Sequence, residues 1–454
     1  MKKNPFLATI CTLALLLGAA EAQAKVSPEE AARLGNELTP LGAIRAGNAE
    51  GTIPPWEGGI TTPPANYKPG MRHPDPYPDD PILFTITAEN AQEYADKLSP
   101  GQIAMLNRYP DTWYMNVYPT RRNASFPERI YQAAMRNALT AELTEGGNGV
   151  INTAEAVPFP IPKEGVEAVW NHLLRFRGVS AGMTFAQVSP TAGGQYTIIT
   201  IEQKVLFPYA APGATMETIN NKALYFLQTV LAPPRLAGEL LLVHDTVDQV
   251  REPRKAWTYN PGQRRVRLAP NIAHDNPGTA SDGQRTSDNL DMFNGSPERY
   301  DWKLVGRKEL YVPYNCYKLH SGDLKYRDIL HRGHVNPAHL RHELHRVWVV
   351  EGTVKAGTRH MYARRTFFID EDTWAIIVAD HYDSRGQIWR VAMGYGINFY
   401  EVPVPYGTME ANYDLLNGRY ISVGLTNEGA PFDFSLELSV EDFTPEALRR
   451  GGRR

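Results

Sequence analysis

The sequence predicts a mainly β protein with helices, built on an antiparallel sheet. The clearest evidence is the segment 341–396, where apolar runs are separated by short turns at residues 355–358, 370–372 and 383–386. Consecutive strands that are joined by short turns pair in the antiparallel direction. The helices expected elsewhere in the chain would then pack on one side of the sheet.

The first 24 residues have the pattern of a signal peptide. Lysines stand at positions 2 and 3, residues 6–20 are mostly apolar, and residues 22–24, Ala-Gln-Ala, match the small-x-small site of signal peptidase. We expect cleavage after Ala24 and a protein in the periplasm or held at the periphery of the outer membrane. No later apolar run is long enough to cross a bilayer as a helix.

Residues 25–165 are predicted to be a proline-rich extension with short helices. Ser27 and Ser99 are each followed by proline. This pattern is typical of a helix start, because the serine side chain caps the first turn and proline fits its first position. Further helices are predicted over residues 89–98 and from residue 125. The extended stretches between them would lie on the surface as arms or move freely in solution.

Residues 166–454 are predicted to be the sheet domain. An amphipathic helix over residues 166–174 is closed by Gly178, and a second helical spacing covers residues 215–232. Besides the segment 341–396, strands are predicted at residues 196–207, 238–250, 255–268 and 432–441, with a short helix from Thr444.

Several of these strands are apolar on successive residues. The runs are residues 240–243, 347–350, 366–369 and 375–379. An antiparallel strand with one face in water alternates apolar and polar residues, so both faces of these strands should be covered. A helix layer, the N-terminal extension or a bound apolar ligand would each provide that cover.

Residues 178–182, Gly-Val-Ser-Ala-Gly, match the G-x-S-x-G motif of serine hydrolases. In those enzymes the serine lies on a turn that leads from a strand into a helix. Here the order is reversed, because a helix ends near Gly178 and a strand-like region follows. An esterase that acts through Ser180 is therefore the least favoured function, and no enzymatic activity is predicted.

The sequence predicts neither a metal site nor a cofactor. Five histidines lie within residues 331–345, but His342 and His345 would point to opposite faces of a strand. The acidic residues 370–372 suit a tight turn without an ion. Cys316 is expected to be buried packing. The formal net charge of −3 gives no electrostatic basis for binding nucleic acid.

Long strings along the chain resemble the domain of unknown function 1329 (DUF1329) family. They are residues 158–165 with 169–178, 231–244, 256–267, 341–355, 365–391 and 443–450. This family is similar to the outer-membrane lipoprotein-sorting proteins LolA and LolB. The resemblance implies a curved antiparallel half-barrel with helices on its concave side, around an apolar cavity for acyl chains. It also implies a resistance-nodulation-division-type transporter and an outer-membrane barrel as partners.

The predicted function is a non-enzymatic periplasmic carrier or chaperone for a lipid, a lipoprotein or another hydrophobic molecule, working with an envelope transporter. The alternative is a structural or adaptor subunit of an envelope complex, in which arms and helices fill the sheet and no ligand is bound. The candidate ligand contacts are large apolar residues of the predicted sheet domain: Trp170, Leu174, Leu227, Leu241, Trp348, Val350, Phe368 and Ile377.

Overall fold

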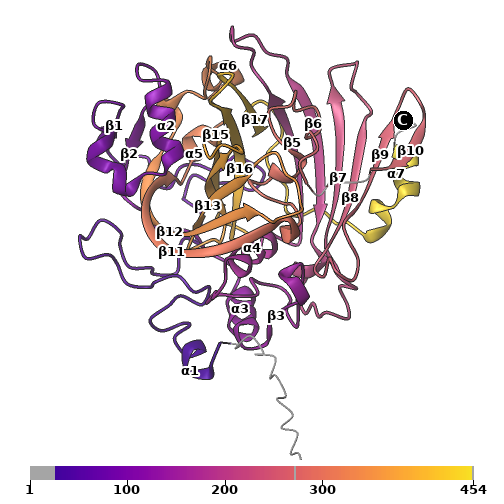
Figure 1. Cartoon of the computed structure of the whole chain (residues 1–454), viewed down its shortest axis with the longest axis horizontal. Coiled ribbons are helices and arrows are strands. Elements are labelled where there is room, and N and C mark those ends of the chain that lie inside the picture. The colour runs from indigo at the N-terminus through magenta and orange to yellow at the C-terminus, as the bar shows by residue number, and fades with distance from the viewer. Residues whose placement is uncertain (1–25, 270–271, 273, 452–454) are drawn as a thin grey trace, which may run out of the picture.

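The computed structural model describes residues 26–269, 272 and 274–451 (Figure 1). The predicted signal peptide, residues 1–24, lies outside the described residues. Within the described part of the chain, no helix is both long enough and apolar enough to span a membrane.

One large sheet, mostly antiparallel, organises the protein. Its strands are β1 (Phe84–Ile86), β2 (Met115–Val117), β5 (Ser180–Val188), β6 (Ile199–Leu206), β7 (Lys222–Ala232), β8 (Leu240–Thr246), β9 (Lys255–Asn260), β10 (Arg265–Leu268), β11 (Tyr300–Pro313), β12 (His342–Val354), β13 (Arg364–Asp370), β14 (Ile376–Tyr382), β15 (Ile388–Phe399), β16 (Val404–Asp414) and β17 (Arg419–Leu425). They follow the order β1-β2-β12-β13-β14-β15-β16-β17-β5-β6-β7-β8-β9-β10, and β11 also pairs with β12. The sheet is not closed on itself. The predicted mainly β fold with an antiparallel sheet is confirmed.

Short helices and one small hairpin connect these strands. They are α1 (Pro28–Ala31), α2 (Pro100–Arg108), α3 (Glu128–Thr140), β3 (Glu142–Leu143), β4 (Val150–Ile151), α4 (Gly165–Leu174), α5 (Tyr317–His320), α6 (Tyr326–Ile329) and α7 (Pro445–Gly451), with a 3-10 helix at Ala91–Lys97. Ser27 and Ser99 cap α1 and α2 as predicted, since each side chain accepts a hydrogen bond from the backbone N–H three residues later.

The helix predicted over residues 215–232 is wrong, because most of this segment is strand β7. Phe226 lies among the residues of the main core, whereas Leu227 packs on the opposite face with residues of α7. A strand that is covered on both faces has apolar residues at many successive positions, and these also satisfy the spacing of a helix. The adjacent aromatic residues Tyr225 and Phe226 are typical of strands.

The final strand predicted at residues 432–441 is also wrong. This segment is irregular, with an isolated bridge from Asp433 to Gly182 and a 3-10 helix at Val440–Phe443. Its apolar residues pack as side chains without strand pairing: the rings of Phe432 and Phe399 are 5.1 Å apart. The helix predicted after Thr444 is confirmed as α7.

Helices cover both faces of the sheet. Helix α4 packs on β11 and β12. Helix α7 packs on β8, β9 and β10 from the outside, where Leu448 meets Leu242 (Figure 1). Helix α2 lies against β14 and β15, with Leu106 beside Val391. The prediction that helices occupy the concave side fits α4 but is wrong for α2 and α7, because the outer face is apolar too and needs its own cover.

Of the four runs predicted to be covered on both faces, those in β12, β13 and β14 are confirmed, whereas the run 240–243 in β8 is covered incompletely. In β13, Phe367, Phe368 and Ile369 are each no more than 3% exposed, although successive side chains face opposite sides. Protein alone covers both faces there. Between β5 and β8 the cover of the inner face is incomplete, and this gap is where the candidate site lies.

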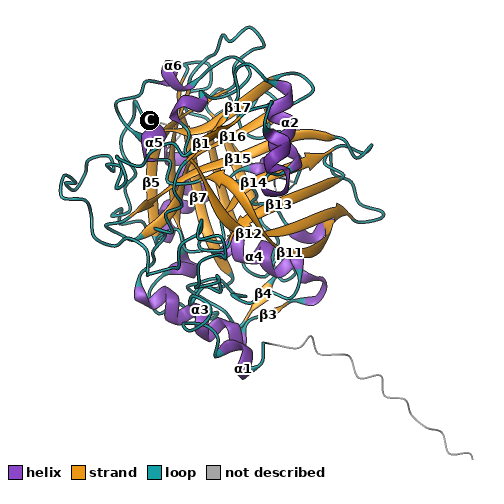
Figure 2. Ribbon diagram, turned by 90° about the vertical axis from the view of Figure 1, so that its left-hand side faces the viewer, coloured by secondary structure: helices purple, strands orange, loops and turns teal. Residues whose placement is uncertain are grey.

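The N-terminal extension packs into the same cores as the sheet. Phe126 and Ile130 belong to the largest core, together with residues of the strands. Figure 2 shows α1 and α3 next to each other at one end of the sheet. The arm around His73 is held on the surface, since the ring Nε2 lies 2.7 Å from the carboxylate of Glu401. A domain boundary between residues 165 and 166 stays a prediction.

Candidate functional site

An irregular segment between β10 and β11, residues 274–294, lies against the inner face of the sheet. We call it the inner segment. Gln187 of β5 donates a hydrogen bond of 2.9 Å to the carbonyl of Thr279. The carboxylate of Glu410 in β16 accepts a hydrogen bond of 2.9 Å from the backbone N–H of Met292. These contacts fix the inner segment to strands that are far from it in the sequence.

A buried ion pair holds the middle of the inner segment. The Asp288 carboxylate accepts a hydrogen bond of 2.7 Å from Arg365 and lies 3.0 Å from the ring Nε2 of His360. Burial alone would raise the pKa of Asp288, but the charge of Arg365 and the bond to His360 outweigh it and hold this pKa well below its usual range. The inner segment is therefore a fixed part of the fold.

A cavity lies between the inner segment and the strands β5–β8, β16 and β17. Its volume is about 200 Å³, and with its opening toward solvent it holds about 1480 Å³ of space that no atom fills. An apolar cavity of about 150 Å³ can already hold benzene. The apolar part of the wall includes Met183, Phe185, Val205, Phe226, Leu241 and Val243. This site can therefore shelter part of an aliphatic or aromatic molecule from water.

Three of the four arginines that line this cavity have carboxylate partners. Asp291 of the inner segment bridges Arg175 and Arg177, which follow α4. Arg254 donates two hydrogen bonds, of 3.1 and 2.6 Å, to Asp245. Asp245 compensates the charge of Arg254, whereas the single carboxylate of Asp291 compensates one of the two charges of Arg175 and Arg177.

The fourth arginine, Arg285, forms no ion pair with any described residue. Its side chain donates a hydrogen bond of 3.3 Å to the carbonyl of Thr286, while Nε has no partner among the residues that the structure describes. Burial lowers the pKa of Arg285, and the nearby charge of Glu410 acts against this. On Glu410 the Oε1 atom also has no partner in the described part of the chain, and burial raises the pKa of this residue to about 7. Both groups line the cavity with unused hydrogen-bonding capacity.

Of the eight residues predicted to contact a ligand, the structure places Leu241 in the cavity wall. The other seven lie elsewhere: Trp170 and Leu174 in a core cluster with Tyr209, Leu227 beside α7, Trp348 and Val350 in the main core, and Phe368 and Ile377 in a separate cluster with Leu310. Strand alternation decides these places, since Phe226 and Gln228 line the cavity and Leu227 between them does not. Contact with a ligand stays a prediction for all eight.

Ser180 lacks the setting of a hydrolase nucleophile. It is the first residue of β5, and its hydroxyl donates a hydrogen bond of 2.7 Å to the carbonyl of Leu436. The chain reaches it from α4 through Gly178, so the order is helix and then strand, as predicted.

Cys316 is buried, and burial raises the pKa of its thiol to about 12. This cysteine is therefore a protonated packing residue at neutral pH.

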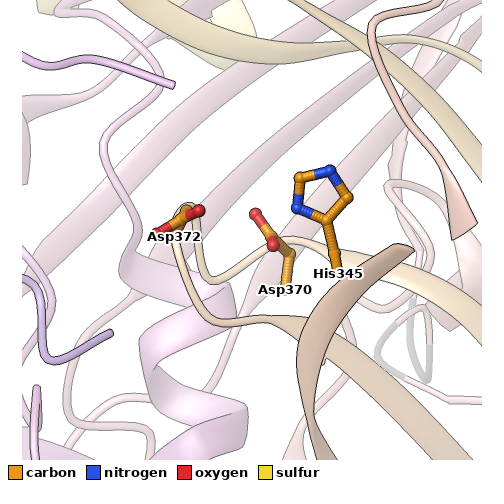
Figure 3. A group of neighbouring side chains, drawn as sticks. All are labelled: His345, Asp370 and Asp372. Atoms are coloured by element: carbon orange, nitrogen blue, oxygen red, sulfur yellow. The ribbon is translucent and has the colours of Figure 1, made fainter. Parts of the chain in front are cut away.

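A second polar group lies outside the cavity wall. It consists of His345 in β12, Asp370 at the end of β13 and Asp372 in the turn that follows (Figure 3). One ligand atom of each lies within 4.8 Å of the others, and all three side chains are buried. Imidazole nitrogen and carboxylate oxygen are ligands of ions such as Zn²⁺ and Mn²⁺. Among the described residues, these three form the group that could hold a metal.

Arginines already neutralise the acidic turn of this group. Asp372 accepts hydrogen bonds of 2.8 and 2.6 Å from Arg122. Glu371 lies 3.3 Å from both Arg307 and Arg346. A cation here would have to compete with three guanidinium groups, so the turn is explained as a structural network of ion pairs.

Sequence reasoning did not find Arg285 or Glu410. The inner segment has no apolar periodicity, and its glycines and polar residues are typical of an ordinary loop. One signal was available in β16, where Glu410 stands between Met409 and Ala411 in a strand that is otherwise mostly buried. An acidic residue inside such a run is an exception that indicates a special environment.

Comparisons with known proteins give one family match. The family model described as "Protein of unknown function (DUF1329)" matches residues 85–449. Protein PA3922 of Pseudomonas aeruginosa, uncharacterised, is 50% identical over 455 residues, which covers 100% of both chains. A candidate outer membrane lipoprotein-sorting protein domain from Vibrio parahaemolyticus is 14% identical, with a TM-score of 0.42 over 60% of this chain and 92% of that one. A DUF1329 family protein from Desulfovibrio piger is 16% identical, with a TM-score of 0.40 over the same shares.

Proposed function

The chain belongs to the DUF1329 family, and we propose that it is a periplasmic carrier or chaperone that holds a lipid, a lipoprotein acyl chain or another hydrophobic molecule in the cavity behind the inner segment. The observation that carries this proposal is the partly open cavity with its apolar wall. Protein interiors are normally close-packed, so a lasting apolar space is unusual. Filling it with an apolar ligand removes surface from water, worth about 25 cal/mol per Å².

The compartment and the partners belong to the same proposal. The leader predicted for residues 1–24 would direct the chain to the periplasm. An envelope transporter of the resistance-nodulation-division type and an outer-membrane barrel would supply or receive the cargo. This last part depends on the family resemblance alone. No catalytic step is included, because the carrier role needs none.

One observation favours the alternative of a structural or adaptor subunit. The inner segment already occupies part of the inner face of the sheet and is fixed there by the ion pair of Asp288 with Arg365. In that case the remaining space would be a packing defect without a ligand. The two functions differ in whether the folded protein takes up an apolar molecule.

A pair of leucine variants tests the carrier proposal. Leu241 and Leu227 are both half-buried and lie on neighbouring strands, but only Leu241 of the two lines the cavity. We expect Leu241→Glu to lose binding of the neutral fluorescent probe N-phenyl-1-naphthylamine while its far-UV circular dichroism stays native. A glutamate at the cavity wall can reach solvent, whereas a charge in a closed core would unfold the sheet.

The matched control is Leu227→Glu, which should keep the probe. The carrier proposal fails if the wild-type protein takes up neither this probe nor a fluorescent fatty acid. It also fails if both variants stay folded and bind the probe as well as the wild type does. In either case the adaptor function takes its place.

A further inference from the structure

The four arginines in the cavity wall differ in whether they have a carboxylate partner. This difference indicates which polar headgroup a ligand would carry. Arg175, Arg177 and Arg254 are tied to carboxylates of the protein. Arg285 is only 3% exposed and has no such partner among the described residues. Burying a charged group without a partner is costly. A buried, unpaired arginine at a ligand cavity is therefore explained if the ligand brings the negative charge.

The backbone holds Arg285 in a defined place. Its carbonyl accepts a hydrogen bond of 3.0 Å from the N–H of Gly278, within a short loop that Pro277 and Thr286 close by an isolated bridge. A Cβ atom at Gly278 would lie 2.6 Å from Nη1 of Arg285. Glycine therefore leaves the room that the guanidinium occupies, and the loop forms a fixed seat for it.

Glu410 adds a second polar atom to the same wall. One of its oxygens accepts a hydrogen bond from the backbone N–H of Met292. The other, Oε1, has no partner among the described residues, although Glu410 is only 7% exposed. When Glu410 is protonated, this group can donate a hydrogen bond to an oxygen atom. Asp291 and Asp245 supply two carboxylates for the three charges of Arg175, Arg177 and Arg254. The wall is therefore already net positive, and Arg285 adds a charge that has no carboxylate partner among the described residues.

We propose that the cavity selects amphiphiles with a single aliphatic chain and an anionic oxygen headgroup, a carboxylate or a phosphate, which Arg285 binds. The chain would lie along Phe185, Phe226 and Leu241, which line the same cavity. Guanidinium matches both headgroups in shape and charge. The cavity volume of about 200 Å³ favours one chain over a bulky multi-chain lipid. This inference rests on the proposed carrier function and goes on to name the class of cargo.

Competition against N-phenyl-1-naphthylamine at pH 7 tests the headgroup, with four twelve-carbon competitors kept below their micellar concentrations. They are dodecanoate, dodecyl phosphate, dodecanol and dodecyltrimethylammonium. We expect the two anions to bind about 10-fold more tightly than dodecanol, the scale of one charged hydrogen bond. The cation should bind most weakly. The ratio between dodecanoate and dodecyl phosphate shows which of the two headgroups fits better.

The variant Arg285→Met should remove most of the preference for the anions over dodecanol and leave dodecanol unchanged, because the one remaining positive charge is shared by Arg175 and Arg177 beside Asp291. Arg285→Lys, which keeps the charge, should retain most of the preference. The control is Arg265→Met, which removes an exposed arginine of β10 that does not line the cavity. It should change no ratio. Far-UV circular dichroism and retained dodecanol binding show whether each variant is folded.

The possible results distinguish the headgroup proposal from the carrier function on which it rests. If dodecanol displaces the probe as well as the anions do, the headgroup inference is overturned and the carrier function stands. If the probe does not bind to the wild-type protein at all, the carrier function itself is wrong. Should Arg285→Met fail to fold, Gly278→Ala replaces it, because the added methyl group displaces the guanidinium and should also lower the anion preference. An unchanged preference in that folded variant would contradict the proposal.

Discussion

The acidic turn at residues 370–372 and the wall of the cavity both bury charged groups, but they treat them in opposite ways. In the turn, Asp372 is paired with Arg122, and Glu371 lies beside Arg307 and Arg346. In the cavity wall, Arg285 and Glu410 each keep a polar atom that no described residue contacts by a hydrogen bond. In the turn, Oδ1 of Asp370 likewise has no partner among the described residues. The two regions therefore differ in their arginines, which are paired with carboxylates around the turn, whereas Arg285 in the cavity wall is not.

This difference teaches how a structural charge can be told from a functional one. A buried carboxylate that is paired with an arginine is stabilised by that partner, so removing the arginine lowers the free energy of unfolding. A buried arginine without a partner already destabilises the folded state, so removing it changes the free energy of unfolding little. Its removal should instead change which ligands the site binds. The ion pairing of the arginines, and not their burial, separates the two regions.

The largest expected effect is on the stability of the turn. Arg122→Met leaves Asp372 buried without its partner, and we expect it to lower the free energy of unfolding by about 3–5 kcal/mol. Arg285→Met, the same substitution in the cavity wall, should change it by about 1 kcal/mol or less. Urea denaturation followed by circular dichroism measures both. Equal losses in the two variants would remove the distinction drawn between the regions.

A smaller effect concerns pH. Burial raises the pKa of Glu410 to about 7, so this group becomes ionised between pH 6 and pH 8 and then repels an anionic ligand. Asp291 faces the same space and has a lowered pKa, whereas burial lowers the pKa of His172 to about 3. Asp291 therefore stays charged and His172 stays neutral over this range, and Asp245 is paired with Arg254.

Dodecanoate should accordingly bind several-fold more weakly at pH 8 than at pH 6, while dodecanol should show no such change. In Glu410→Gln the difference between the two pH values should vanish. Probe displacement at each pH measures it. A dodecanoate affinity that rises with pH, or a pH dependence that persists in Glu410→Gln, would show that another group controls the site.

The smallest expected effect is that of metal ions on the turn. Both oxygens of Asp372 accept hydrogen bonds from Arg122, and the arginines around the turn repel cations. We expect added Zn²⁺ or Mn²⁺, or treatment with EDTA, to leave the thermal midpoint unchanged. A midpoint that rises with Zn²⁺ in the wild type but not in His345→Ala would mean that the turn is a metal site.

The sequence allows the sheet to be predicted better than the site. The turns within residues 341–396 are indicated by short runs of turn-forming residues, so the strands on either side of them could be predicted from the local sequence. The segment 215–232 could not, because burial on both faces of β7 hides the period that separates strands from helices. The missing partner of Arg285 is a property of the folded surroundings, set by segments as distant as Gly278 in the loop and Glu410 in β16. No local pattern contains it.

The central claim is that the cavity of the folded protein holds an amphiphile. Native mass spectrometry of protein that is secreted with its own leader, released by osmotic shock and kept free of detergent tests this most directly. The account predicts a bound species above the mass of the polypeptide, removed by organic extraction and identified in the extract as a single-chain anionic lipid. A spectrum of the bare polypeptide, together with an extract that contains no lipid, would contradict it.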